Sequence, residues 1–288
     1  MNRKLFLLLL ALLAGAQFAF AQKKDLREIE SKIENEGKAL YRSEWASWYG
    51  SDIFIAKCKD KQPLSGGFIS YETPNGRNNV FYTREESPKV LATISFGADF
   101  NKDNYQLDTT SRAFTPAERE LYELKHAAQI RMTKDTTFKV YKNSALNPVP
   151  LIHNGVKKVY VLTGPQVNGV VLFGNDYLLD LDKNNNVTKV SKLHKSLIPA
   201  YFTNTTGDST KNQAAAMHSH LPEYDEFMTV TDICTLMLYE KFTTWNQCMV
   251  ISKDYISIWD CKKDSLLILT TEAWKKITND HEQRTKKE

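Results

Sequence analysis

The chain has 288 residues, of which 42% are hydrophobic and 25% are charged, and its formal net charge at pH 7 is +4. This length fits one large domain or two small ones, with ample material for a core. Acidic and basic residues are interspersed apart from a Lys/Glu-rich end, which excludes a nucleic-acid groove, so nucleic acid is not expected as a partner.

The first 21 residues have the three parts of a secretory signal peptide. Arg3 and Lys4 form a positive start, Leu5–Leu13 is an apolar run, and Ala19 and Ala21 are the small residues of a cleavage site. The run is shorter than the roughly 20 residues that span hydrocarbon, so we expect no stable membrane insertion. Cleavage lowers the net charge from +4 to +2 because Arg3 and Lys4 are removed. The pattern predicts an exported protein of bacterial type, periplasmic or extracellular.

Residues 22–112 predict a helix followed by a small β-meander. Apolar residues recur at helical spacing over Asp25–Leu40, with charges between them. After Trp45 the sequence pattern changes to short β-rich runs separated by glycine and proline turns. The predicted strands are Asp52–Ala56, Gly67–Tyr71, Asn79–Tyr82 and Val90–Phe96. The polar stretch 101–112 is the expected domain boundary.

Residues 113–275 predict a second, α+β domain. Thr115, Pro116 and Glu118 are helix-start residues for a helix that runs to about Met132, and a second helix is expected over Thr229–Tyr239. The remaining runs are β-rich: Phe138–Tyr141, Lys158–Leu162, Gly169–Phe173, Tyr177–Leu181, Val187–Val190, Ala214–His220, Cys248–Ser252, Tyr255–Trp259 and Leu266–Leu269. Residues 276–288 are a charged tail. The predicted fold class is α+β, a mixed sheet with flanking helices after a small β-rich N-terminal region.

Four cysteines show neither a dense disulfide framework nor a zinc-ribbon spacing. Cys248 and Cys261 flank a predicted hairpin, where a disulfide and a pair of buried free thiols are both compatible with the sequence.

The segment His218-Ser219-His220, followed by Thr229-Val230-Thr231-Asp232, is the candidate functional site. On a strand the side chains alternate, so His218 and His220 point to one face and can bind one ion. Asp232 in the first turn of the next helix supplies a third ligand. Three protein ligands with an open position for water is the arrangement of a catalytic zinc.

This segment resembles the signature of the JAMM (JAB1/MPN) metalloproteases, in which His-x-His is followed by a loop and Ser-x-x-Asp at a helix start. The resemblance implies that His218, His220 and Asp232 bind zinc, that Thr229 takes the place of the catalytic serine, and that a peptide or protein is the substrate. It covers at most residues 115–270, and the loop after His220 is one residue longer than usual.

The family's catalytic glutamate has no counterpart in the nearest matching segment, where Gln166 stands in its place. An amide cannot accept a proton from a zinc-bound water. The resemblance therefore implies an inactive relative or an enzyme with another base. The available carboxylates are Glu118, Glu120, Glu123 and Glu223.

Other interpretations of these residues stay open. Thr229 and Asp232 also fit an ordinary N-cap with an acid in the first helical turn. Asp180-x-Asp182-x-Asn184 has the opening of a calcium loop but fits a hairpin turn better. His153 and His194 are interpreted as surface or satisfied polar residues.

The sequence thus predicts an exported zinc-dependent peptidase or isopeptidase. The alternative is a non-catalytic envelope protein that uses the same fold for binding or scaffolding.

Overall fold

The structure, a computed structural model, describes residues 24–202 and 215–285. The predicted signal peptide at residues 1–21 lies outside these residues. The described chain is an α+β fold with three four-stranded sheets and one two-stranded sheet, which confirms the predicted class. Its helices are α2 (Leu26–Lys57), α3 (Pro116–Lys134), α4 (Val230–Tyr239) and α5 (Thr271–Thr285), with single 3₁₀ turns at Gln62–Leu64 and Glu240–Phe242.

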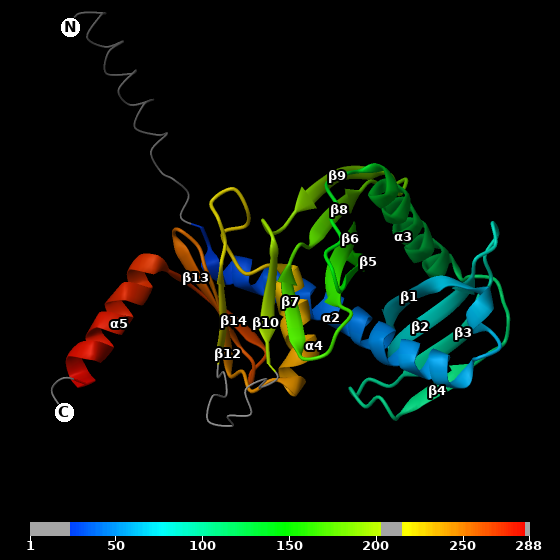
Figure 1. Cartoon of the computed structure of the whole chain (residues 1–288), viewed down its shortest axis with the longest axis horizontal. Coiled ribbons are helices and arrows are strands. Elements are labelled where there is room, and N and C mark those ends of the chain that lie inside the picture. The colour runs from blue at the N-terminus through cyan, green and yellow to red at the C-terminus, as the bar shows by residue number, and fades with distance from the viewer. Residues whose placement is uncertain (1–23, 203–214, 286–288) are drawn as a thin grey trace, which may run out of the picture.

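Helix α2 is the long central helix of the described chain, and it extends well beyond the helix predicted over Asp25–Leu40. Figure 1 shows it running from the C-terminal sheet at one end to the N-terminal sheet at the other. The predicted strand Asp52–Ala56 is wrong because these residues form the last turns of α2. Phe54 is buried there and its ring stacks on that of Phe81 at a centroid distance of 3.8 Å. Packing of this ring outweighs the β propensity of Ile53 and Ile55.

The N-terminal β-meander is confirmed and has a fourth strand. Its antiparallel strands are β1 (Ser65–Thr73), β2 (Gly76–Thr83), β3 (Val90–Phe96) and β4 (Tyr105–Asp108), paired in that order. Helix α2 lies so close to β2 that a Cβ atom at Gly50 would sit 2.4 Å from the Asn79 side-chain oxygen. The contact requires glycine at position 50.

The central sheet has the order β5-β6-β8-β9, from β5 (Ser144–His153), β6 (Val156–Pro165), β8 (Tyr177–Leu181) and β9 (Val187–Lys192). Strand β5 was missed and the predicted strand Phe138–Tyr141 is wrong. Pro148 and Pro150 lie within β5, which is acceptable because β5 is an edge strand and proline cannot donate to a ladder. Strands β7 (Val170–Gly174) and β10 (Leu197–Tyr201) form a separate antiparallel pair.

The tight connection between β8 and β9 is the predicted hairpin turn rather than a calcium loop. Asp182 accepts hydrogen bonds from the backbone amides of Asn184 and Asn186, and Asn185 has a φ of 64°. Asparagine tolerates this left-handed conformation.

The C-terminal sheet has the order β11-β12-β13-β14, and its strand β14 hydrogen-bonds directly to α2 through Glu30 and Glu34. Its strands are β11 (Ala215–Ser219), β12 (Gln247–Ile251), β13 (Tyr255–Asp260) and β14 (Ser265–Thr270). Strand β11 pairs with β12 in parallel, and the other pairs are antiparallel. A Cβ atom at Gly37 of α2 would lie 2.8 Å from Ile233 of α4, so the two helices are in direct contact.

One core cluster includes Trp45 and Phe96 as well as Trp259 and Ile268, which lie on both sides of the predicted boundary near residue 112. The division into residues 22–112 and 113–275 stays a prediction. The segment expected to be a charged tail forms most of α5, which has no buried residue and projects from the body (Figure 1).

All four cysteines are free thiols in this structure. Cys248 and Cys261 lie close enough for their thiols to interact, and this hydrogen bond together with burial raises the pKa of Cys248.

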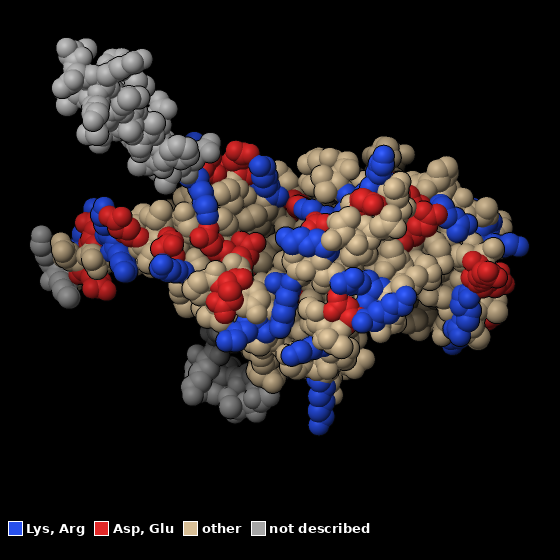
Figure 2. Space-filling view, turned by 90° about the horizontal axis from the view of Figure 1, so that it is seen from above, with Lys and Arg blue, Asp and Glu red and all other residues tan. Residues whose placement is uncertain are grey.

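Within residues 24–202 and 215–285, no helix combines the length and hydropathy needed to cross a membrane. Figure 2 shows basic and acidic side chains interspersed on the face in view, as the sequence indicated.

Helix α3 begins at a buried ion pair. Glu118 has a fully buried side chain that accepts hydrogen bonds from Arg112 at 2.6 and 2.8 Å, from the Tyr71 hydroxyl at 2.9 Å and from the Thr115 amide at 2.8 Å. Thr115 caps the Glu118 amide in return, so the predicted helix start is a complete capping box. Burial alone would raise the pKa of Glu118, but Arg112 and the Thr115 amide lower it.

We expect Glu118→Gln to lower the free energy of unfolding by about 2 kcal/mol at pH 7, because a charged network loses one partner while Arg112 keeps access to solvent. Because the pKa of Glu118 is lower in the folded than in the unfolded protein, its ionised form stabilises the fold above pH 4.5. This stabilisation is lost as the pH falls through the lowered pKa of the folded state. Urea unfolding should therefore show the two proteins converging below pH 4.5. Glu123→Gln on the exposed side of α3 is the control, with a change within about 0.5 kcal/mol. Equal stability of Glu118→Gln and the parent at pH 7 would contradict this assignment.

Candidate metal centre

Two histidines at the end of β11 provide the first part of the candidate site. The His220 amide donates to the Ile251 carbonyl at 2.9 Å, which extends the β11–β12 pairing past Ser219. His218 and His220 therefore share one face of the strand, as predicted. Their Nε2 atoms lie 3.3 Å apart. The Nδ1 of His220 lies 3.0 Å from the Asp225 carbonyl and donates to it, so its Nε2 presents a lone pair.

Asp232 reaches these rings from the first turn of α4. Its Oδ2 accepts hydrogen bonds from the Thr229 amide and the Thr229 hydroxyl, both at 2.8 Å. The Thr229 hydroxyl in turn accepts from the Asp232 amide, so the N-cap interpretation is confirmed as a capping box. The cap fixes the carboxylate and turns its second oxygen, Oδ1, toward the imidazoles.

A fourth residue, His194, completes the group, and the interpretation of it as a surface or satisfied polar residue is wrong. It lies between β9 and β10 and is 2% exposed. Its Nε2 is 3.2 Å from Asp232 Oδ1. Gly174 makes room for it, because a Cβ atom there would lie 3.2 Å from His194 Cβ and 2.3 Å from the Ser196 carbonyl oxygen. Gly174 also has a φ of +75°, which favours glycine.

The four ligand atoms, one from each of His194, His218, His220 and Asp232, all lie within 4.8 Å of one another. The Nε2 atoms of His218 and His220 are 3.6 and 3.7 Å from the Asp232 carboxylate. Within this group, Asp232 Oδ1 and both ring nitrogens of His194 are buried and have no hydrogen-bond partner. Buried polar atoms normally have a partner, and a cation would satisfy Asp232 Oδ1 and one ring nitrogen of His194. The group could hold a metal ion.

The electrostatics of the group favour a cation. Burial alone raises the pKa of Asp232, but His194 and His218 hold it well below its usual range, so this carboxylate is ionised. Burial lowers the pKa of His218 to about 4 and also lowers that of His220. Burial opposes protonation of His194 as well, but Asp232 outweighs it and raises the pKa. An anion beside two neutral imidazoles is a ligand set for a divalent ion.

A cavity of about 380 Å³ opens on the imidazole side of the group. All three histidines line it together with Lys195 and Tyr224, whereas Asp232 and Thr229 are buried behind them. Thr229, the predicted catalytic residue, therefore contacts Asp232 and is not among the lining residues.

None of the carboxylates considered as a base lines this cavity. Glu118 is bound to Arg112, Glu120 pairs with Lys157, and Glu123 accepts from Asn185. Glu223 lies in the loop before Asp225. Gln166, at the nearest match to the family's glutamate, lines a different cavity.

The nearest additional buried carboxylate is Asp176, between β7 and β8. It is 2% exposed and its Oδ1 accepts from the Thr163 amide at 2.8 Å. Burial raises its pKa to about 7, and its charge acts on His194. It is a further acidic group behind the site.

The chain matches no protein-family model, and comparisons with curated proteins and with solved structures gave no match. The likeness to the JAMM signature therefore rests on the sequence motif and stays a prediction.

We expect His194→Ala to lower zinc affinity by at least about 100-fold, because loss of even an outer-shell partner costs 10- to 100-fold. Competition titration with a chromogenic chelator measures this. His153→Ala, on β5 and outside the group, is the matched control and should leave the affinity unchanged. An unchanged affinity in His194→Ala would exclude this residue as a ligand.

Substitution of Thr229 separates its roles. Thr229→Val keeps the shape but removes the hydroxyl, so we expect zinc affinity to fall about tenfold and unfolding free energy by about 1 kcal/mol. Thr229→Ser should retain both. Titration and thermal unfolding of the two variants provide the measurement, and a Val variant that binds zinc normally would contradict a role in orienting Asp232.

Proposed function

We propose that this chain is an exported zinc-dependent hydrolase of peptide or isopeptide bonds, with His194, His218, His220 and Asp232 as the metal site. The observation that carries the proposal is that three imidazoles lining a solvent-open cavity converge on one carboxylate buried behind them. The motif resemblance and the export signal expected from the sequence support the substrate class and the location.

The donor set favours zinc in a reactive site rather than a structural one. Structural zinc sites are rich in cysteine thiolates, whereas catalytic sites use histidine and carboxylate ligands. None of the free cysteines belongs to this group. A zinc ion bound here would polarise a carbonyl group or acidify a water molecule.

Residues next to the ligands hold the ligand side chains in place by hydrogen bonds. The Asp225 carbonyl fixes the ring of His220, and Thr229 fixes Asp232. Such partners orient the ligands and tune their basicity. Lys195, Ser196, Ser219 and Tyr224 line the cavity and offer polar groups to a substrate.

A second candidate function, a zinc-stabilised binding protein, is favoured by two observations. Four protein ligands complete a tetrahedral site, which is typical of a closed centre. Among residues 24–202 and 215–285, no carboxylate lines the cavity to act as a base. In this case the ion would tie β11, α4 and the β9–β10 connection together.

Metal analysis and hydrolysis assays on the same preparation test both functions. We expect protein purified without chelator to hold about one zinc and to cleave fluorogenic peptide or isopeptide substrates. Activity should fall with chelation, return with zinc, and drop at least about 100-fold in Asp232→Asn, while His153→Ala remains active.

The outcomes separate the candidates. Zinc without hydrolysis across both substrate classes would support the binding protein. Folded protein that takes up no zinc would contradict both.

A further inference from the structure

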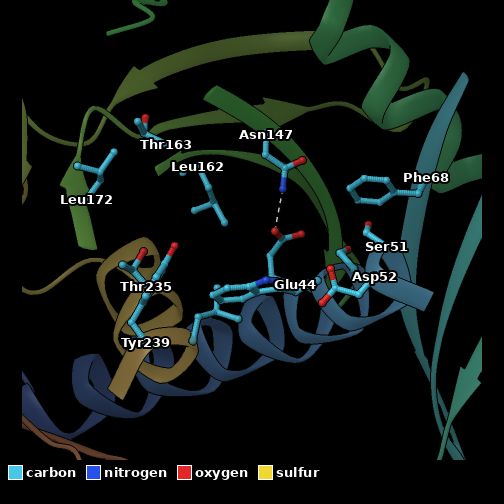
Figure 3. A pocket seen from close by; sticks show the side chains of 14 residues that line it. Glu44, Ser51, Asp52, Phe68, Asn147, Leu162, Thr163, Leu172, Thr235 and Tyr239 are labelled. Atoms are coloured by element: carbon cyan, nitrogen blue, oxygen red, sulfur yellow. Dashed lines mark hydrogen bonds between the residues drawn. The ribbon is translucent and has the colours of Figure 1, made fainter. Parts of the chain in front are cut away.

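A second cavity, of about 260 Å³, lies between α2, the strands β5–β7 and α4. It belongs to a different part of the fold from the metal group and shares no lining residue with the metal-side cavity. Figure 3 shows Glu44 rising from α2 toward Asn147 on β5, with Leu162 and Leu172 on the opposite wall.

Glu44 is 9% exposed and carries an oxygen without a partner. Its Oε2 accepts from the Asn147 side-chain amide at 2.7 Å. Its Oε1 is buried and has no hydrogen bond within the described chain. A buried carboxylate oxygen without a donor is costly, and its place on the wall of a cavity points to a donor that enters from outside.

The charge of the cavity specifies the kind of donor. Two carboxylates, Glu44 and Asp52, line it, and within the described part of the chain no lysine or arginine does. Lys125 is the nearby cation that influences Glu44, but its ammonium donates to the Phe68 carbonyl at 2.9 Å and is not among the lining residues. The cavity is therefore suited to a positively charged guest.

Apart from Asn147 and four hydroxyl side chains, the rest of the wall is apolar or aromatic. Trp48, Phe68 and Tyr239 line the cavity, and the rings of Trp48 and Tyr239 lie 5.2 Å apart. Aromatic faces attract cations and also bury an apolar body. A few polar groups on a largely apolar wall are the usual composition of a small-molecule site.

We propose that this cavity binds a small primary amine with a compact aromatic or aliphatic body, whose ammonium group donates to Glu44 Oε1. Asn147 holds the carboxylate in place, and the aromatic residues enclose the body of the guest. The proposal does not depend on the metal centre.

The state of Glu44 is consistent with this role. Burial raises its pKa to about 7, against the opposing effects of Lys125, Ser47 and Asn147. A cationic donor that entered the cavity would stabilise the ionised form of this carboxylate.

Binding of a panel of amines to the full chain tests the proposal. The probes are n-butylamine, benzylamine, phenethylamine and tryptamine, each measured by calorimetry and by thermal shift. The neutral isostere 2-phenylethanol is compared with phenethylamine. We expect at least one amine to bind, and phenethylamine to bind at least about tenfold more tightly than the alcohol if it is among them.

Two variants and one control locate the binding. Glu44→Gln should weaken amine binding at least about tenfold. Glu240→Gln is the matched control, because burial also raises the pKa of Glu240 to about 7 but it does not line the cavity. Gly164→Leu fills the cavity from β6, where an added Cβ meets no atom within 4 Å, and should also abolish binding.

The results decide in either direction. Loss of binding in Gly164→Leu with retention in Glu240→Gln supports the assignment even where Glu44→Gln fails to fold. Failure of all four amines to bind, equal affinity for amine and alcohol, or unchanged binding in a folded Glu44→Gln overturns it.

Discussion

The carboxylate of Asp232 is the contact on which the candidate site depends. Its Oδ2 is held by the N-terminus of α4 through Thr229 and lies nearest His220, and its Oδ1 lies nearest His194 and His218. A buried anion needs compensation from both hydrogen bonds and positive charge. The helix cap supplies the first, and the histidines or a bound cation supply the second. The cap and the ligand are thus one structure, and the two interpretations of Thr229-x-x-Asp232 are compatible.

Helix α2 makes this arrangement possible by holding the sheets and α4 in one body. Its contact with Ile233 of α4 at Gly37 positions the helix that bears Asp232. Further along, the same helix contributes Glu44 and Trp48 to the second cavity, which is proposed to bind an amine. Both candidate sites therefore rest on the packing of one long helix whose C-terminal turns the sequence pattern did not predict.

Local patterns predicted what depends on neighbours in the chain. The capping box at Thr115, the alternation that pairs His218 with His220, and the turn at Asp182 are all short-range features, and each is present. Features set by distant contacts were missed. His194 lies 24 positions before His218 in the printed sequence and has no motif of its own, so only the fold brings it to Asp232. Strand β5 was hidden by Pro148 and Pro150, because edge position is a property of the whole sheet.

Helix α4 is short, at ten residues, and it contributes to both the metal group and the cavity of Glu44. Asp232 faces the imidazoles, and Thr235, one turn later, lines the cavity of Glu44. If a guest in the Glu44 cavity shifted α4, it would also shift Asp232 relative to the imidazoles. The metal ion and the guest would then change each other's affinity by the same factor. Two sites without a common residue would in that way respond to one another as regulator and target.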